Sequence, residues 1–156
     1  MKIRKATKKD LDQLVELSHQ LYMDQMNRCQ VEFILRKNFK RIQKREFSKR
    51  LKDPKKVFFV ADEDGEIVGF ISGNLEEDPP IFMYRKKGHI GEFYVKEEFR
   101  GRGIGKKLFA EMKKWFRKKK VKTVRLYVVK CNIGAKKMYK SLGFKPVDIE
   151  QLVLGM

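Results

Sequence analysis

The chain has 156 residues, of which 42% are hydrophobic and twelve are phenylalanine, and its formal net charge at pH 7 is +18. This length and composition exclude a disordered chain and suit one hydrophobic core, so residues 1–156 are expected to form a single globular domain. No run reaches the roughly 18 apolar residues of a membrane span, and the start lacks the apolar stretch of a secretory signal. We therefore expect a cytoplasmic location and no membrane partner.

The cysteines and histidines give no pattern typical of a disulfide framework or a metal site. Cys29 and Cys131 lie far apart without CxxC spacing, and His19 and His89 are each isolated. Structural zinc sites need clustered ligands at short spacings. Neither a disulfide framework nor a bound metal is expected.

Helices dominate the first third of the expected fold. After a short apolar start around Ile3, Thr7 and Asp10 form a capping pair for a helix over residues 7–22. One face of that helix is apolar, with Leu11, Leu14, Val15, Leu21 and Tyr22. Apolar residues recur at helical spacing over about residues 30–51 and predict a second helix, which "KDPKK" ends.

Strands follow, rich in β-branched and aromatic residues. Residues 57–62 and 66–75 flank the turn "EDG" and predict an antiparallel hairpin. Residues 89–95 predict another strand, which leads into a glycine-rich loop and a helix over 103–120.

The last elements are a strand over 123–129, a short helix from Asn132 to Gly143, and strands over 144–147 and 149–155. The whole order predicts an α/β (α+β) domain with a mixed, mostly antiparallel twisted sheet of about 6–7 strands and about four helices.

The glycine loop, "EEFRGRGIGKKLF" at residues 97–109, joins a strand to a helix and so offers backbone N–H groups to an anion. No Gly-x4-Gly-Lys-Ser/Thr spacing is present, which excludes a P-loop, and Lys106 stands where a dinucleotide fingerprint needs its third glycine. What remains is Arg100-x-x-Gly103-x-Gly105 followed by lysines. The alternative is a solvated basic corner, where salt screens the charges.

This stretch resembles the signature of the Gcn5-related N-acetyltransferase (GNAT) superfamily, Arg/Gln-x-x-Gly-x-Gly/Ala after a strand. A second segment, "CNIGAKKMYKSLGFK", resembles the family's Asn-x-x-Ala-x-x-x-Tyr-x-x-x-Gly-Phe pattern. The resemblance is strong over about residues 57–154. It implies a GNAT-like domain that binds acetyl-CoA where the parallel strands "EFYV" and "RLYVV" splay apart.

The resemblance implies a cofactor site made of three parts. The backbone of the loop would hold the pyrophosphate, the strand before it would lie along the pantetheine, and lysines would meet the adenosine phosphates. The residues implied are Phe93, Tyr94, Val95, Arg100, Gly101, Arg102, Gly103, Ile104, Gly105, Lys106, Asn132 and Lys136.

The resemblance also implies catalytic roles for two residues. Tyr139 matches the usual general acid, which protonates the departing thiolate, and its alternative role is a core tyrosine. Glu92 is the candidate base, directly or through a water, and its alternative is an outward-facing strand carboxylate. Cys131 could carry the acetyl group in a ping-pong reaction, but no histidine stands near it to activate it, so direct transfer in a ternary complex is favoured.

The motifs leave the amine acceptor open between small molecules and peptide or protein amines. A chain of +18 repels polycations, which disfavours polyamines unless Glu76, Glu77, Asp78 or Glu92 line the acceptor mouth. The alternative function is a nucleic-acid-associated basic protein that uses the fold as a scaffold, although no nucleic-acid-binding motif is evident. The assembly is expected to be a monomer or a homodimer.

Overall fold

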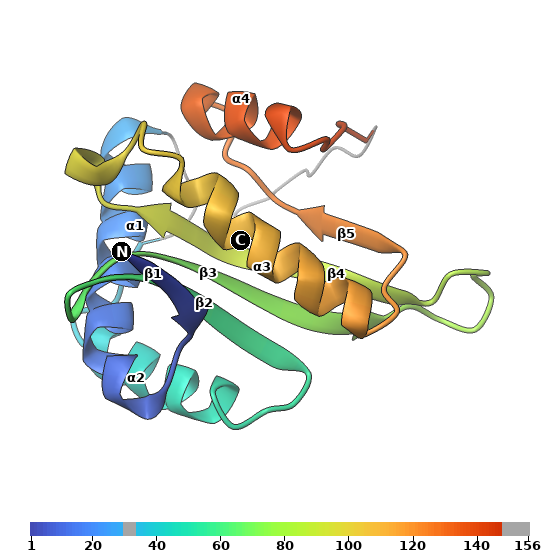
Figure 1. The fold of residues 1–156 in the computed structure, drawn as a ribbon, viewed down its shortest axis with the longest axis horizontal. Coiled ribbons are helices and arrows are strands. Elements are labelled where there is room, and N and C mark those ends of the chain that lie inside the picture. Colours follow the sequence, from blue (N-terminus) through green and yellow to red (C-terminus); the bar gives the residue numbers. More distant parts are fainter. Residues whose placement is uncertain (30–33, 148–156) are drawn as a thin grey trace, which may run out of the picture.

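The computed structural model describes residues 1–29 and 34–147, which form one five-stranded sheet with helices on both faces (Figure 1). The strands are β1 (Lys2–Lys5), β2 (Lys56–Glu63), β3 (Glu66–Glu77), β4 (Lys86–Val95) and β5 (Thr123–Leu126). The α-helices of the described residues are α1 (Leu11–Arg28), α2 (Phe39–Arg50), α3 (Ile104–Lys118) and α4 (Ile133–Ser141). The predicted α/β class and mixed sheet are confirmed.

The strands lie in sequence order across the sheet, β1 to β5, and only the last pair is parallel. The β2–β3 hairpin turns at Asp64 and Gly65, whose φ angles are 51° and 95°. Two successive positive φ angles are typical of the tight hairpin turn that matches the twist of the strands. The predicted hairpin is therefore confirmed.

Each face of the sheet is covered by its own apolar cluster. On one face α3 packs Leu108, Met112 and Phe116 against residues such as Val57 and Ile90. On the other, α1 and α2 pack Leu14, Leu17 and Phe47 against Phe58, Val60 and Phe70. Figure 1 shows α3 crossing one face, with α1 and α2 on the far side.

Three sequence predictions of secondary structure were wrong or too long. The second helix begins at Phe39 and not near residue 30, and Ile34, in the stretch before it, is 87% exposed. The strand predicted over 123–129 ends at Leu126. Residues 144–147 form no strand, and the strand predicted over 149–155 lies outside the described residues, so the described sheet has five strands and not six or seven.

The expectation of no disulfide was also wrong. Cys29, at the end of α1, is bonded to Cys131, just before α4, and their Cα atoms are 5.9 Å apart. The two cysteines are 102 residues apart in sequence. They meet only because α1 packs beside the segment that follows β5, so the spacing of the two cysteines in the sequence could not predict the bond.

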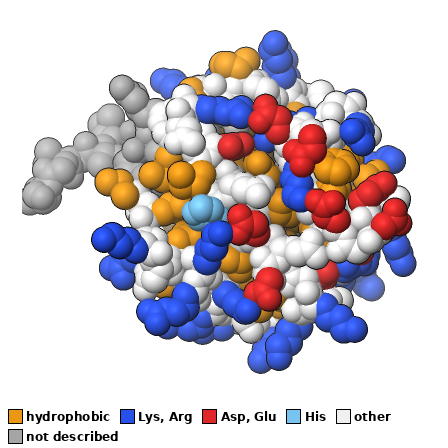
Figure 2. All heavy atoms as spheres, turned by 90° about the vertical axis from the view of Figure 1, so that its left-hand side faces the viewer, with side chains coloured by type: hydrophobic (Ala, Val, Ile, Leu, Met, Phe, Trp, Pro, Cys, Tyr) orange, Lys and Arg blue, Asp and Glu red, His pale blue; other side chains and the backbone are white. Residues whose placement is uncertain are grey.

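Charged side chains are unevenly distributed on the face shown in Figure 2. The acidic side chains gather mainly on its right half, and lysine and arginine lie mostly around its edge. Within residues 1–29 and 34–147, no helix has both the length and the apolar character needed to cross a bilayer. The same residues contain no group of three or more histidine, cysteine or acidic side chains placed to hold a metal ion.

Candidate active site

The site begins where β4 and β5 separate. Their parallel pairing runs from Lys87 opposite Thr123 to Ile90 opposite Leu126 and stops there. Immediately beyond it, Gly91 and Glu92 on β4 face the single residue Ser72 on β3, which makes a β-bulge. A bulge bends its strand and re-aims its side chains. Here it coincides with the end of the β4–β5 ladder and opens the predicted splay.

A hollow of about 290 Å³ lies beside the splay. Its walls come from α1, from the β4 bulge and from the segment that continues β5, namely Leu21, Tyr22, Gln25, Gly91, Glu92, Tyr127, Val128 and Val129. We call it the acceptor pocket, because Glu92, the candidate base, lines it. The wall beyond β5 is open to solvent, since Tyr127 is 76% exposed.

Glu92 is the buried polar centre of this pocket, with only 6% of its surface exposed. Ser18 Oγ and Gln43 Nε2 each donate to Oε1 at 2.9 Å, and Arg50 Nη1 donates to Oε2 at 3.1 Å. The backbone N–H of Glu92 donates to Ser72 Oγ, which lies in the bulge. The outward-facing reading of Glu92 is therefore wrong, and the buried charge is offset by Arg50.

Tyr22 adds a fourth donor to the Glu92 carboxylate. Burial and the neighbouring Glu92 charge, with a hydrogen bond from the phenol to that carboxylate, raise the pKa of Tyr22 to about 12. A carboxylate offers about four lone-pair sites. With Ser18, Gln43, Arg50 and Tyr22 as donors, the Glu92 side chain is held in one orientation.

Sequence reasoning missed these donors, although α1 carries a signal for two of them. Ser18 and Tyr22 are one helical turn apart, and Ser18 is fully buried on the face that otherwise carries leucines. A polar residue inside an apolar stripe needs a partner. Gln43 and Arg50 give no such signal, because α2 is polar over most of its surface.

The glycine loop adopts the backbone that its sequence requires. Gly101 and Gly103 have φ angles of 78° and 75°, a region that favours glycine, and Gly103 is the N-cap residue directly before α3. Gly105 is needed for another reason, since a Cβ there would lie 3.1 Å from Met138 Sδ of α4. The first backbone bond of the helix joins Lys107 N–H to Gly103 O. The preceding N–H groups therefore face outward at a positive helix end, as an anion site requires.

The two arginines of the loop are tied to it. Arg100 donates through Nε to Val95 O at 2.9 Å and lies over the Tyr94 ring, while Arg102 donates to Glu98 O at 3.0 Å. Both guanidinium groups thus fix the loop's shape. The charge of Lys106 on the exposed first turn of α3 remains available to an anion.

The predicted cofactor strand divides its side chains between the two faces. Phe93 and Val95 pack on the α3 side, and Tyr94 is buried on the α1 side. Ile104 is also buried in the core. Tyr94 and Ile104 can therefore meet a cofactor only through their backbones.

The helix α4 brings the predicted acid to the same splay. Asn132 caps it by accepting a hydrogen bond from the Ala135 N–H at 3.0 Å, which confirms the predicted cap. Tyr139 packs against Phe93 and Phe144, with ring centroids 6.2 and 5.8 Å apart, and burial raises its pKa to about 12. Lys136 is exposed on the same helix.

Glu92 and Tyr139 therefore approach the splay from opposite sides. Glu92 faces α1 and α2, whereas the next residue along β4, Phe93, contacts Tyr139 on the α3 and α4 side. A reacting group between β4 and the end of β5 would have a carboxylate network on one side and a phenol on the other. This arrangement suits proton removal and proton donation at a single reacting centre.

Comparisons with known proteins agree with this geometry. The chain is 38% identical over 111 residues to an N-alpha-acetyltransferase of Sulfurisphaera tokodaii, covering 66% of this chain and 65% of that protein. It is 34% identical to an uncharacterized N-acetyltransferase of Archaeoglobus fulgidus, covering 90% of both. The crystal structure of a predicted acetyltransferase from Clostridium acetobutylicum with acetyl-CoA has the same fold, with a TM-score of 0.81, 22% identity and coverage of 99% and 95% of the two chains. The family model for the acetyltransferase (GNAT) family matches residues 19–144, and the chain therefore belongs to that family and is an N-acetyltransferase.

Proposed function

We propose that this enzyme transfers the acetyl group of acetyl-CoA directly to the amine of a peptide or protein in a ternary complex. The observation that carries the proposal is the coincidence of four features at one place. Glu92 and part of its network line the acceptor pocket at the β4–β5 splay, and the next residue along β4, Phe93, packs against Tyr139 and beside Gly105 of the glycine loop. Acetyl-CoA is bound in the related Clostridium structure, and CoA in an aminoglycoside N-acetyltransferase of the same fold.

The pyrophosphate of acetyl-CoA would lie against the N–H groups of residues 101–106, at the positive end of α3. Lys106 and Lys136 would meet the outer phosphates by charge, and the backbone of Phe93, Tyr94 and Val95 would lie along the pantetheine. The Val95 N–H is the candidate donor to the thioester carbonyl. The loop's φ angles and the orientation of the strand's side chains support these assignments.

The acceptor must lose a proton before or during its attack. Because four donors already occupy the Glu92 carboxylate, the shortest route runs through one of them. We infer that the ammonium passes its proton to the Tyr22 oxygen as the Tyr22 proton moves to Glu92. Tyr22 lines the pocket, so its oxygen can meet the amine.

The leaving thiolate needs a proton from the other side. Tyr139 is the candidate donor, because its phenol is kept protonated by burial and it contacts the α3 side of β4. Cys131 is bonded to Cys29 and has no free thiol to carry an acetyl group. The structure thus favours direct transfer over a covalent enzyme intermediate.

The acceptor side fits a peptide amine better than a polyamine. Glu76, Glu77 and Asp78, the acidic residues near the sheet's end, are paired with Arg125, Arg85 and Lys87. They leave no free row of carboxylates for a polycation. The pocket itself has apolar walls in Leu21, Val128 and Val129, which suit a small side chain next to a single amine. The N-alpha-acetyltransferase name of the Sulfurisphaera relative supports a peptide α-amine.

The test is an acetyl-CoA-dependent thiol-release assay on three acceptors: peptides with a free α-amine, the same peptides with the α-amine blocked and a free lysine, and spermidine. We expect turnover on the free α-amines. Turnover on spermidine alone, or on no amine, would overturn the acceptor assignment.

Variants separate the roles. Tyr22→Phe and Tyr139→Phe should each lower kcat about 10²-fold or more without weakening acetyl-CoA binding, since general acid–base groups contribute about 10²–10⁴. Tyr84→Phe is the matched control, because Tyr84 is exposed on the β3–β4 hairpin and does not line the acceptor pocket. Full turnover in Tyr22→Phe would remove Tyr22 from the proton route.

A further inference from the structure

A second hollow lies at the other end of α3, away from the glycine loop. Its volume is about 360 Å³, within the range of small-molecule sites. It is lined by the end of β1, the turn between α2 and β2, and the last turn of α3. Since α3 has 15 residues and rises about 1.5 Å per residue, this hollow is about 20 Å from the glycine loop.

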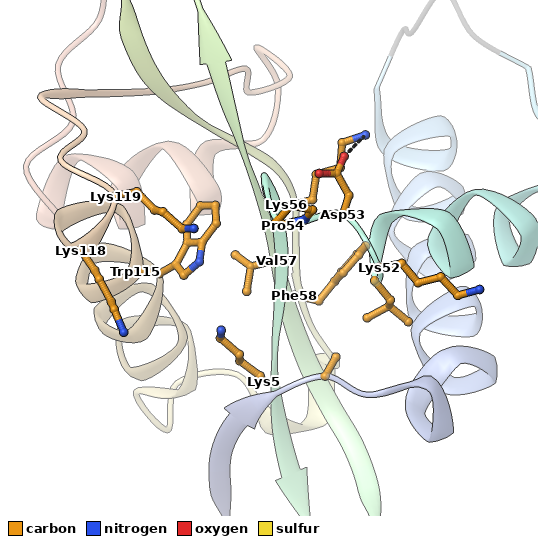
Figure 3. Close-up of a pocket in the computed structure, with 12 residues that line it drawn as sticks. Lys5, Lys52, Asp53, Pro54, Lys56, Val57, Phe58, Trp115, Lys118 and Lys119 are labelled. Carbon is orange, nitrogen blue, oxygen red and sulfur yellow. Dashed lines mark ion pairs between the residues drawn. The ribbon is translucent and has the colours of Figure 1, made fainter.

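The floor of this hollow is apolar and its rim is basic, so we call it the lysine pocket. Trp115, 7% exposed, points from α3 toward Val57 on β2, as Figure 3 shows. The Lys5 and Lys119 side chains extend into the space beside them, and Lys118 lies one position earlier on the helix (Figure 3). Lys52 points away on the other side of the strands, and Lys56 is paired with Asp53 at 3.6 Å.

The three lysines on the β1 and α3 side of the hollow carry charges that no carboxylate of the described residues offsets. Among the described residues, Lys5, Lys118 and Lys119 form no ion pair, and Lys119 lies over the Trp115 ring at 5.9 Å. The C-terminal end of α3 contributes about half a negative charge. The pocket therefore presents between two and three uncompensated positive charges next to an apolar floor.

We propose that the lysine pocket binds a phosphate-bearing ligand with a flat apolar part, of the nucleoside-phosphate class. The number of unpaired lysines distinguishes two kinds of ligand that have both an apolar part and a negative charge, namely a fatty acid and a nucleoside phosphate. A fatty acid brings one negative charge, whereas a nucleoside di- or triphosphate brings three or four and can satisfy all three lysines. Its ring would lie on the Val57 and Trp115 floor. The phosphate could belong to a free nucleotide or to a nucleic-acid backbone.

The chain contains its own reporter for this binding. Trp115 is the single tryptophan of the sequence and forms part of the pocket floor, so its fluorescence reports on this site. The experiment titrates ATP into the protein with acetyl-CoA at saturating concentration, so that the glycine loop is already occupied. We expect a saturable change in Trp115 fluorescence, a smaller response to pyrophosphate, and none to laurate.

Charge variants test the location. Lys5→Gln and Lys118→Gln should each weaken ATP binding about five- to tenfold, while Lys113→Gln should leave it within about twofold. Lys113 is the matched control, because it is exposed on the same helix and does not line the pocket. An equal loss in all three variants would show a diffuse field and overturn the proposal.

Other outcomes are equally decisive. No saturable change at millimolar ATP, a change that saturating acetyl-CoA abolishes, or a response to laurate alone would each overturn the proposal. A short oligouridine that displaces ATP would identify the phosphate source as a nucleic-acid backbone. Failure to displace ATP would identify it as a free nucleotide.

Discussion

Reduction of the Cys29–Cys131 bond should destabilise the enzyme and loosen its acceptor pocket. The bond closes a loop of 102 residues, and the chain-entropy relation gives about 4.7 kcal/mol for a loop of roughly this length. Native disulfides contribute about 2–4 kcal/mol in typical cases. At about 3 °C per kcal/mol for a domain of this size, loss of the bond should lower Tm by about 6–12 °C.

The place of the bond predicts which kinetic constant changes. Cys29 follows the helix that carries Tyr22, and Cys131 follows the segment that carries Val128 and Val129, so the bond fastens the two walls of the acceptor pocket to each other. The glycine loop lies on another segment. KM for the peptide acceptor should therefore rise several-fold on reduction, while the Kd of acetyl-CoA stays within about twofold.

The assay compares oxidised and dithiothreitol-treated wild type with a Cys29→Ser, Cys131→Ser double variant. Thermal unfolding gives Tm, and thiol release gives KM. The double variant should match the reduced wild type and should not respond to dithiothreitol. Two reactive thiols in the denatured, untreated protein, or a Tm unchanged by reduction, would refute the reasoning.

Three further predictions concern pH and backbone conformation. Burial holds the pKa of Tyr139 at about 12, so the pH–rate profile should show no alkaline fall below about pH 11. Because a tyrosine in the unfolded chain ionises near pH 10, the stability that Tyr139 contributes should be lost as the pH rises from about 10 to about 12. Hydrogen bonds from Arg4 lower the pKa of Asp10 from 3.8 to about 2, so stability present above pH 4 should be lost toward pH 2, and urea unfolding of Asp10→Asn should be less sensitive to pH in that range. Lys120, two residues after the end of α3, has a φ of 59°, so Lys120→Gly should raise the unfolding free energy by about 0.5–1 kcal/mol. A lower unfolding free energy in the variant would exclude backbone strain at this position.

The conformation of the glycine loop and of α4 could be predicted from the sequence because their parts are local. Gly101, Gly103 and Gly105 lie within five residues, and each is required by a φ angle or a close approach that glycine alone meets easily. Asn132 caps its own helix, and Tyr139 lies on the same helix. Short-range geometry of this kind is recorded directly in residue spacing.

The network around Glu92 could not be predicted in the same way, because it is assembled from distant segments. Ser18 and Gln43 meet Glu92 across 74 and 49 residues of sequence, and the disulfide spans 102. The β4 bulge that aims Glu92 inward also has no local marker beyond Gly91, which Ser72 Oγ would crowd if it bore a Cβ. Alternation along a regular strand would place Gly91 and Glu92 on opposite faces, and the bulge places both toward α1 and α2.

The Glu92 network and the glycine loop are built from different segments, so residues of the network can vary separately from the loop. A buried carboxylate beside the reacting centre must be offset by donors, and in this chain α2 supplies Gln43 and Arg50 while α1 supplies Ser18. Ser18, Gln43 and Arg50 contact Glu92 on the side opposite α3 and α4. The contacts of α1 with the glycine loop come instead from Asp24 and Arg28, which pair with Arg100 and Glu97, so Gln43 can change without disturbing the loop. Substitution of Gln43 should therefore alter the relative rates on different amine acceptors while the Kd of acetyl-CoA stays constant, because the network that we propose to act on the acceptor is carried by the N-terminal helices and the proposed phosphate site is not.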